Sequence, residues 1–252
     1  MSEFFIELFS EEIPANLQNK TRQDFFQNVK EFLEKEDIKY SGEAAAFSIP
    51  NRLIVYFQNI SKKIIKKGNE IRGPNINAPE DALNGFLKSY KISIDKTYKK
   101  KTDKGEFYFF KKPSENIETK FVLQKNLPKI LDKISWKKSM RWADHELYWG
   151  RPLKSILCCF DNKTLEFVYH HLVSSNITFI DKDFEQKTKK FVRFKDYLAF
   201  FKSQNIILDN KKREQFIVDQ LNRIAKKENL KIHFNLNLLN EVTNIVEKPN
   251  II

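Results

Sequence analysis

Apolar and aromatic residues fill nearly every position of the first segment, Phe4–Phe9. Aromatic and β-branched residues favour a strand, and the near-absence of polar positions predicts burial on both faces. Glu7 interrupts this pattern, because a buried carboxylate costs several kcal/mol unless it is paired. The interpretation favoured on general grounds is an edge position that points Glu7 to water. The alternative is an acidic group that holds an arginine or an amine.

The next segments predict a β-α-β-β module. An apolar stripe at helical spacing runs through 15–36, and two strands are expected at 44–50 and 53–60. Glu11 and Glu12 lie just before Pro14, where they would complement the dipole of that helix. A basic linker is expected over 61–79, where Gly73-Pro74 should break any regular element.

The pattern then predicts a helix at 79–90, a hairpin at 98–112 turning at Asp103-Lys104-Gly105, and a helix at 115–134 that Pro128 bends or interrupts. Phe107 and Phe109 share one face of the hairpin, which is more often a core face. A hairpin of basic and aromatic residues also suits RNA.

Residues 135–152 lack periodicity and predict a loop that contains all three tryptophans. Arg141 beside Trp142 suggests a guanidinium stacked on an indole, an arrangement that suits RNA. The alternative is that Arg141 or Arg151 is buried and paired with a carboxylate. Asp144 and His145 are only a weak indication of acid-base catalysis, since neighbours in sequence rarely face each other.

A second hairpin is expected from strands at 153–160 and 164–172, the first of which could join Phe4–Phe9 in a central sheet. Helices follow at 194–204, at 209–227 with Asp209 or Asn210 as its cap, and at 235–246, with a short strand at 206–208. We therefore expect an α/β (α+β) fold of mixed, mostly antiparallel sheets with packed helices. Its domains would be 1–192, with two sub-modules split near 61–79, and a mainly helical segment, 193–252.

Composition indicates a folded protein with an affinity for polyanions. The 252 residues are 41% hydrophobic and 13% aromatic, and the net charge is +12. The basic residues fall in clusters, each of which is either a solvated face or a phosphate contact. The candidate nucleic-acid contacts are Lys99, Lys100, Lys101, Arg141, Lys187, Lys189, Lys190 and Arg193.

Other chemistry has little support in the sequence. Cys158 and Cys159 are neighbours in an apolar strand, so both should be buried reduced thiols that point to opposite faces. The four histidines lack zinc-site spacing, and no phosphate loop or nucleophile with an adjacent base is recognisable. We expect no catalytic, cofactor or metal site in this segment, and a cytoplasmic protein without a membrane span.

Five segments, in order and across the whole chain, resemble the β subunit of the bacterial heterotetrameric glycyl-tRNA synthetase. They are FIELFSEEIP at 5–14, RGP at 72–74, DKGE at 103–106, SMRW at 139–142 running to RP at 151–152, and LNEVTNIVEKP at 239–249. The chain departs from the family at Asn51, where an arginine is usual, and over 176–184, which lacks the usual glycine, histidine and arginine. The apolar end at Ile251-Ile252 suggests a piece of a longer chain.

The resemblance implies a non-catalytic role. In this family an α subunit uses ATP and Mg²⁺ to make glycyl-adenylate, whereas the β subunit supplies tRNA(Gly) recognition within an α2β2 assembly. The N-terminal part of β is similar to the B3/B4 region of the phenylalanyl enzyme, an α/β fold. The alternatives are a stand-alone RNA-binding module and a hydrolytic editing domain, although glycine's small size reduces the need for editing. The resemblance also makes the acidic residues structural ion-pair candidates, with Glu7, Glu11 and Glu12 opposite Arg52, Arg141 and Arg151.

Overall fold

The computed structural model describes residues 2–66, 68–180 and 187–251, which form two compact units. Unit 1 combines Met1–Lys62 with Glu118–Ile252, and unit 2 is the insertion Lys63–Ile117. The division therefore differs from the expected one. A boundary does fall in the basic segment after residue 60, but the chain returns to unit 1 at Glu118, and the helices after 193 belong to that same unit.

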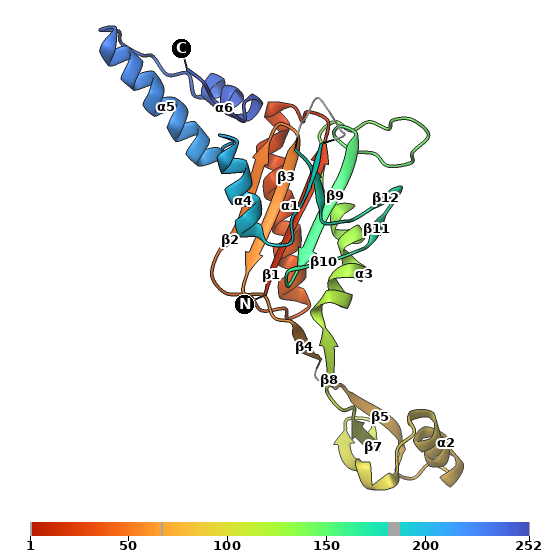
Figure 1. The fold of residues 1–252 in the computed structure, drawn as a ribbon. Helices are drawn as coiled ribbons and strands as arrows, with labels where there is room; N and C mark the ends of the chain where they lie inside the picture. The colour runs from red at the N-terminus through yellow and green to blue at the C-terminus, as the bar shows by residue number, and fades with distance from the viewer. Residues whose placement is uncertain (1, 67, 181–186, 252) are drawn as a thin grey trace. The chain divides into compact units, whose positions relative to one another are not determined.

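Unit 1 is built on a five-stranded antiparallel sheet whose strand order is β10-β9-β1-β3-β2 (Figure 1). The strands are β1 (Glu3–Ser10), β2 (Ala44–Ile49), β3 (Arg52–Gln58), β9 (Leu153–Phe160) and β10 (Lys163–Thr164). The first strand lies in the middle, between β3 and β9. This position explains its apolar pattern, because a central strand covered on both sides has no face toward water.

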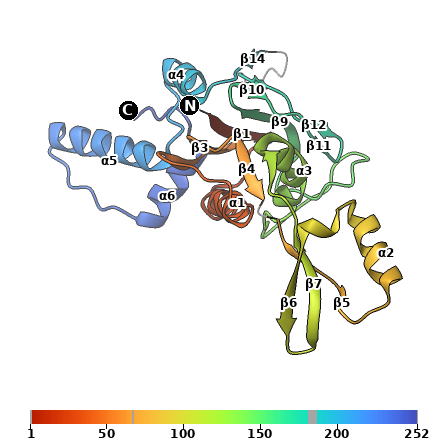
Figure 2. The same ribbon diagram turned by 90° about the horizontal axis from the view of Figure 1, so that it is seen from below.

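Helices cover both faces of this sheet (Figures 1 and 2). On one face lies α1 (Ala15–Lys35), where the ring of Phe26 stacks on Phe57 of β3 at 5.3 Å, and α3 (Thr119–Leu131) contacts α1. On the other face lies α4 (Phe194–Ser203). Because side chains alternate along a strand, β1 gives Phe4, Ile6 and Leu8 to the first face and its odd-numbered residues to the second.

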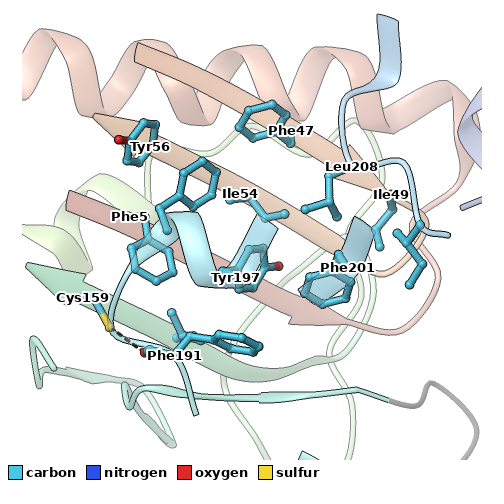
Figure 3. Close-up of a cluster of buried hydrophobic side chains, with 13 residues drawn as sticks. Phe5, Phe47, Ile49, Ile54, Tyr56, Cys159, Phe191, Tyr197, Phe201 and Leu208 are labelled. Atoms are coloured by element: carbon cyan, nitrogen blue, oxygen red, sulfur yellow. Dashed lines mark hydrogen bonds between the residues drawn. The ribbon is translucent and has the colours of Figure 1, made fainter. Parts of the chain in front are cut away.

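The core beneath α4 is rich in aromatic rings (Figure 3). Phe194 stacks on Tyr56 at 4.1 Å, and the Tyr197 ring lies 5.9 Å from that of Phe5. Cys159 donates a hydrogen bond from its thiol to the Phe191 carbonyl at 3.3 Å. Many of the chain's 23 phenylalanines therefore serve packing, since large rings bury a great deal of apolar area.

The last helices, α5 (Asn210–Lys227) and α6 (Leu236–Ile245), are joined to the sheet through a buried arginine. Arg213 is fully buried and donates hydrogen bonds to the carbonyls of Ser48 (2.9 Å) and Thr243 (2.7 Å). Burial lowers its pKa to about 10. Asp209 caps α5 as predicted, since its side chain accepts hydrogen bonds from two backbone amides of the first turn.

The described residues of unit 2 form a three-stranded antiparallel sheet, a two-stranded ribbon and one α-helix. The sheet has the strand order β5-β7-β6, and the ribbon pairs β4 with β8. The elements are β4 (Lys63–Lys66), β5 (Glu70–Asn75), α2 (Glu80–Tyr90), the 3-10 turn η1 (Ile94–Lys96), β6 (Thr97–Thr102), β7 (Gly105–Lys111) and β8 (Glu115–Glu118). The expected hairpin at 98–112 is confirmed by the pairing of β6 with β7.

Several expected elements differ from the structure in kind or in extent. The segment 61–79 is not irregular but supplies β4 and β5, and Pro74 is accommodated in β5 at a register shift on an edge strand. The helix expected from 115 begins at Thr119, because 115–118 pairs as β8, and it continues through Pro128. No strand forms at 206–208, where Ile206 and Leu208 instead pack into the core under α4.

The second predicted hairpin is only partly correct. β9 joins β1 as expected, but its partner β10 has two residues, after which the chain forms separate small pairs. These pairs are β11 (Val168–Tyr169) with β12 (Leu172–Val173), and β13 (Ile177–Phe179) with β14 (Thr188–Lys190). Both cysteines are free and buried, as predicted. The mixed α/β class with antiparallel sheets is likewise confirmed.

Candidate functional site

Glu7 lies at the centre of the sheet with no exposed surface, so the prediction that it points to water is wrong. It faces α4, because it shares the odd-numbered side of β1 with Phe5. Two hydroxyl donors and one cation surround its carboxylate. Thr178 and Tyr197 donate hydroxyl hydrogen bonds to Oε1 and Oε2, and the Arg52 Nε lies 3.6 Å from Oε2. The buried charge is therefore paired and hydrogen-bonded, as its cost requires.

Arg52 enters this cluster from β3, where it pairs in register with Phe9. Its guanidinium lies over the ring of Phe9 at 4.4 Å and over that of Phe201 at 5.1 Å, and it donates a hydrogen bond to the Phe179 carbonyl. Only 3% of its side chain is exposed. Two aromatic faces and one carboxylate thus compensate a cation held away from water.

The electrostatics of this cluster favour a structural role. Burial, together with the nearby Glu7 charge, raises the pKa of Tyr197 well above its usual range, so its hydroxyl remains a donor at neutral pH. A carboxylate with both oxygens engaged and no exposed surface cannot reach a substrate. We call Glu7, Arg52, Thr178 and Tyr197 the buried polar cluster; it fixes β1, β3, β13 and α4 to one another.

The other acidic candidates lie at the surface. Glu11 forms an ion pair with Lys154 at 2.5 Å, and not with one of the expected arginines. Glu12 is exposed and lines a pocket of about 290 Å³ together with Asn51 and Lys248. Of the expected arginine partners, Arg151 donates to the Gly150 carbonyl at 3.1 Å, while Arg141 is exposed; neither forms an ion pair within the described residues.

Residues 135–152 form the predicted loop, with one bridge between Met140 and Trp149. The ring partners of Trp142 are His145 and His171 at 6.2 and 5.8 Å, and the two imidazoles stack at 3.5 Å. The described contacts thus link Trp142 to histidines in place of the expected Arg141 stack. Burial and the neighbouring histidines lower the pKa of His171. His145 thus stacks on the imidazole of His171. Its position next to Asp144 in the sequence did not predict this contact.

The candidate nucleic-acid contacts fall on both units. Lys99, Lys100 and Lys101 follow one another along β6 of unit 2. The others belong to unit 1, with Arg141 in the loop, Lys187, Lys189 and Lys190 in or before β14, and Arg193 at the start of α4.

Several of these cations already have intramolecular partners. Arg193 bonds both carboxylate oxygens of Asp196, and the Lys189 Nζ lies 4.1 Å from the centre of the Phe200 ring. Lys100 pairs with Glu70 at 2.5 Å, and Tyr98 donates its hydroxyl to the same carboxylate. These two hydrogen bonds lower the pKa of Glu70. Lys99 and Lys101 are exposed, and no ion pair is described for either of them.

Other kinds of site find no support in the described residues. Within 2–66, 68–180 and 187–251, no group of three or more His, Cys, Asp or Glu side chains could hold a metal ion. None of the helices described is long and apolar enough to span a bilayer.

Sequence reasoning missed Thr178 and Tyr197. Thr178 lies in the segment that departs from the family, of which 181–184 falls outside the described residues. The available signal was Glu7 itself, because a carboxylate in a doubly buried strand requires donors from whatever packs on it.

The family model described as the glycyl-tRNA synthetase beta subunit matches residues 4–252. Curated relatives include the glycine–tRNA ligase beta subunits of Rickettsia prowazekii, 36% identical over 250 residues, and of Rickettsia felis, 35% identical over 251 residues. These alignments cover 99% of this chain but 37% and 38% of the relatives, so the chain spans little more than a third of their length. The chain belongs to the glycyl-tRNA synthetase beta subunit family.

Proposed function

We propose that this chain acts as the N-terminal part of a glycyl-tRNA synthetase β subunit, binding tRNA(Gly) and assembling with a catalytic α subunit in an α2β2 complex. The observation that carries the proposal is the family match across nearly the entire chain. The net charge of +12 supports it, since a cationic surface attracts RNA phosphates.

In this proposal the chemistry belongs to the α subunit. Glycine activation would use ATP and Mg²⁺ there, and the chain contributes no catalytic group of its own. The buried polar cluster supports this division of labour, because the carboxylate that sequence reasoning singled out is enclosed by donors and aromatic rings. The role of unit 1 would be that of a rigid scaffold in a cytoplasmic assembly.

Aminoacylation with a chimera tests the proposal. The α and β subunits of a relative such as the Rickettsia prowazekii enzyme provide the reference activity. A chimeric β whose N-terminal part is replaced by this chain should charge tRNA(Gly) with glycine when α is present. This chain added to α alone should leave charging at the level of α alone.

Three results would overturn the proposal. The first is a chimera that folds and binds α yet gives no charging above α alone. The second is charging of tRNA(Gly) by this chain without α, which would place an active site in it. The third is hydrolysis of mischarged tRNA by the chain, which would identify an editing domain instead.

A further inference from the structure

The three-stranded sheet of unit 2 has one covered face and one open face. On the covered face, Phe86 and Tyr90 of α2 contact Phe110 of β7 with ring separations of 6.0 and 5.2 Å (Figure 2 shows α2 beside this sheet). In the described part of unit 2, α2 is the one α-helix. The side chains that alternate with Phe110 therefore project from the opposite side of the sheet.

The strand register determines which residues share this opposite side. Tyr98 of β6 and Arg72 of β5 both pair with Phe109, and Lys100 of β6 pairs with Phe107. Because residues in register lie on the same side of a sheet, these five side chains form one surface. We call Arg72, Tyr98, Lys100, Phe107 and Phe109 the open face.

Contacts on the open face alternate cations with rings, and the Glu70 carboxylate lies among them, bonded to Tyr98 and Lys100. The Arg72 guanidinium lies 4.8 Å from the centre of the Phe107 ring, and the Lys100 Nζ lies 5.4 Å from that of Phe109. Tyr98 stacks beside Phe109 at 6.2 Å and remains 40% exposed, whereas Phe109 is buried. The Phe109 ring is therefore packed beneath its neighbours, whereas the rings of Tyr98 and the half-buried Phe107 lie nearer to solvent.

Such a surface is unusual for the uncovered side of a small antiparallel sheet, which normally carries polar residues. Phe109 and the hydroxyl bond to Glu70 hold Tyr98 in place, but α2 does not cover its exposed ring, because the ring contacts of α2 are made on the other side. Aromatic rings and arginine planes on an open sheet are, however, a recurrent means of stacking unpaired RNA bases.

The charge of unit 2 favours the same ligand. Residues 63–117 contain 13 of the 45 lysines and arginines but 7 of the 33 acidic residues, so about a fifth of the chain carries half of the net charge. Lys99 and Lys101 are exposed on β6, an edge strand, where they alternate with Tyr98 and Lys100 and so start from the other side of the sheet. A flexible single strand can bring its phosphates to these cations while its bases contact the rings.

We propose that the open face of unit 2 binds unpaired nucleotides of RNA, with bases stacked on Tyr98 and on the Arg72–Phe107 pair, and with phosphates along the β6 edge, near Lys100 on the open face and near Lys99 and Lys101 on the other side of that strand. This inference rests on the proposed tRNA-binding function and deepens it by assigning the ligand of one surface. It distinguishes the open face from a general basic surface, which would bind paired and unpaired RNA alike.

The test measures binding of the complete 252-residue chain to two fluorescent probes. One is an unstructured 12-nucleotide RNA of adenine and uracil, and the other is the same strand paired with its complement. Tyr98→Ala should weaken single-strand binding roughly 5- to 150-fold, the range for loss of one stacked base. Its effect on duplex binding should stay below about twofold.

Two matched variants separate stacking from folding. Tyr98→Phe keeps the ring but removes the hydroxyl bond to Glu70, and it should retain the single-strand affinity. Tyr90→Ala removes a tyrosine of similar exposure, 43%, from α2 on the covered face. This variant should also keep the single-strand affinity of the unaltered chain. Arg72→Lys keeps the charge but loses the guanidinium plane, so it should weaken single-strand binding selectively.

The outcomes are distinguishable. The inference is wrong if Tyr98→Ala leaves the single-strand affinity unchanged, or if it lowers the affinities for the single strand and the duplex equally. Neither result would contradict the proposed function. An equal loss of single-strand binding in a Tyr90→Ala chain that keeps the circular dichroism of the unaltered chain would also overturn it, because the effect would then not be specific to the open face. If the unaltered chain binds neither probe nor tRNA(Gly), the inference and its RNA-binding premise both fail.

Discussion

Glu7 of β1 and Arg52 of β3 form an ion pair inside the sheet, with 3.6 Å between Oε2 and Nε and with side chains that are 0% and 3% exposed. Removing one member of a buried pair leaves the other uncompensated. Glu7→Gln should therefore lower the free energy of unfolding by about 3–5 kcal/mol. Urea unfolding followed by tryptophan fluorescence measures this in unit 1, where all three tryptophans lie.

The control for that experiment is an exposed pair. Lys20 and Asp24 form an ion pair one turn apart on α1, where Lys20 is 63% exposed, so Lys20→Ala should cost no more than about 0.5 kcal/mol. The double variant Glu7→Gln/Arg52→Met should be more stable than the sum of the single variants predicts, because no charge is left buried. Equal costs for Glu7→Gln and Lys20→Ala would contradict the structural role of the buried pair.

Tyr197→Phe removes one hydroxyl donor to Glu7 while keeping the ring that packs against Phe5 and Phe201. A hydrogen bond to a charged group contributes about 1.5–3 kcal/mol, and this is the expected loss of stability. Tyr148, 63% exposed in the loop, provides the matched control, since Tyr148→Phe should change stability by less than about 0.5 kcal/mol. Unfolding curves that are identical for the two variants would argue against the hydrogen bond.

The two thiols should be unreactive in the folded protein. Cys158 and Cys159 are buried, and burial together with the Glu3 charge raises the pKa of Cys159 from 9.0 to about 12. With a thiol-specific chromogenic reagent at pH 8, we expect no reaction in native protein and two thiols per chain after denaturation. Two rapidly reacting thiols under native conditions would show that β9 is not buried.

The same shift predicts alkaline destabilisation. A folded-state pKa raised above the unfolded value contributes stability that is complete below pH 9 and is lost as the pH rises from 9 to about 12. Urea midpoints should therefore be flat from pH 7 to 8.5 and should then fall, less steeply in Cys159→Ala than in the unaltered chain. A steeper fall in the variant would contradict this sign.

Binding of tRNA(Gly) should weaken with salt in proportion to the phosphates contacted. If Lys99 and Lys101 each neutralise one phosphate, Lys99→Ala/Lys101→Ala should reduce the slope of log affinity against log salt by about 1.4–1.8. Lys211→Ala/Lys226→Ala removes the same charge from exposed positions of α5 and should leave the slope nearly unchanged. Equal reductions for both double variants would show that only net charge matters.

Two glycines should respond in opposite directions to alanine. A Cβ on Gly150 would come within 2.1 Å of the Trp136 ring, so Gly150→Ala should cost about 1–3 kcal/mol and alter tryptophan fluorescence. A Cβ on Gly85 would meet no atom within 4 Å, and Gly85→Ala in α2 should stabilise unit 2 by about 0.5–1 kcal/mol. Thermal unfolding monitored by circular dichroism compares them. A neutral Gly150→Ala would mean that the loop packs differently.

The sequence was informative wherever a local pattern decided the structure. The periodicity of 15–36 and the Asp209 cap predict α1 and α5, because spacing and capping act within a few residues. The adjacent cysteines in an apolar run predict buried thiols for the same reason. The five family segments add the assignment to the β subunit family, which spacing and composition could not supply.

By itself, then, the sequence determined most helices and strands, the cationic character and the family. Tertiary structure decided what the anomalous residues do. Glu7 belongs to the core because β3, β13 and α4 bring Arg52, Thr178 and Tyr197 to it from positions 45 to 190 residues away, and no local pattern records such distant partners. The open face arises likewise from strand register, which converts alternating residues of three strands into one surface.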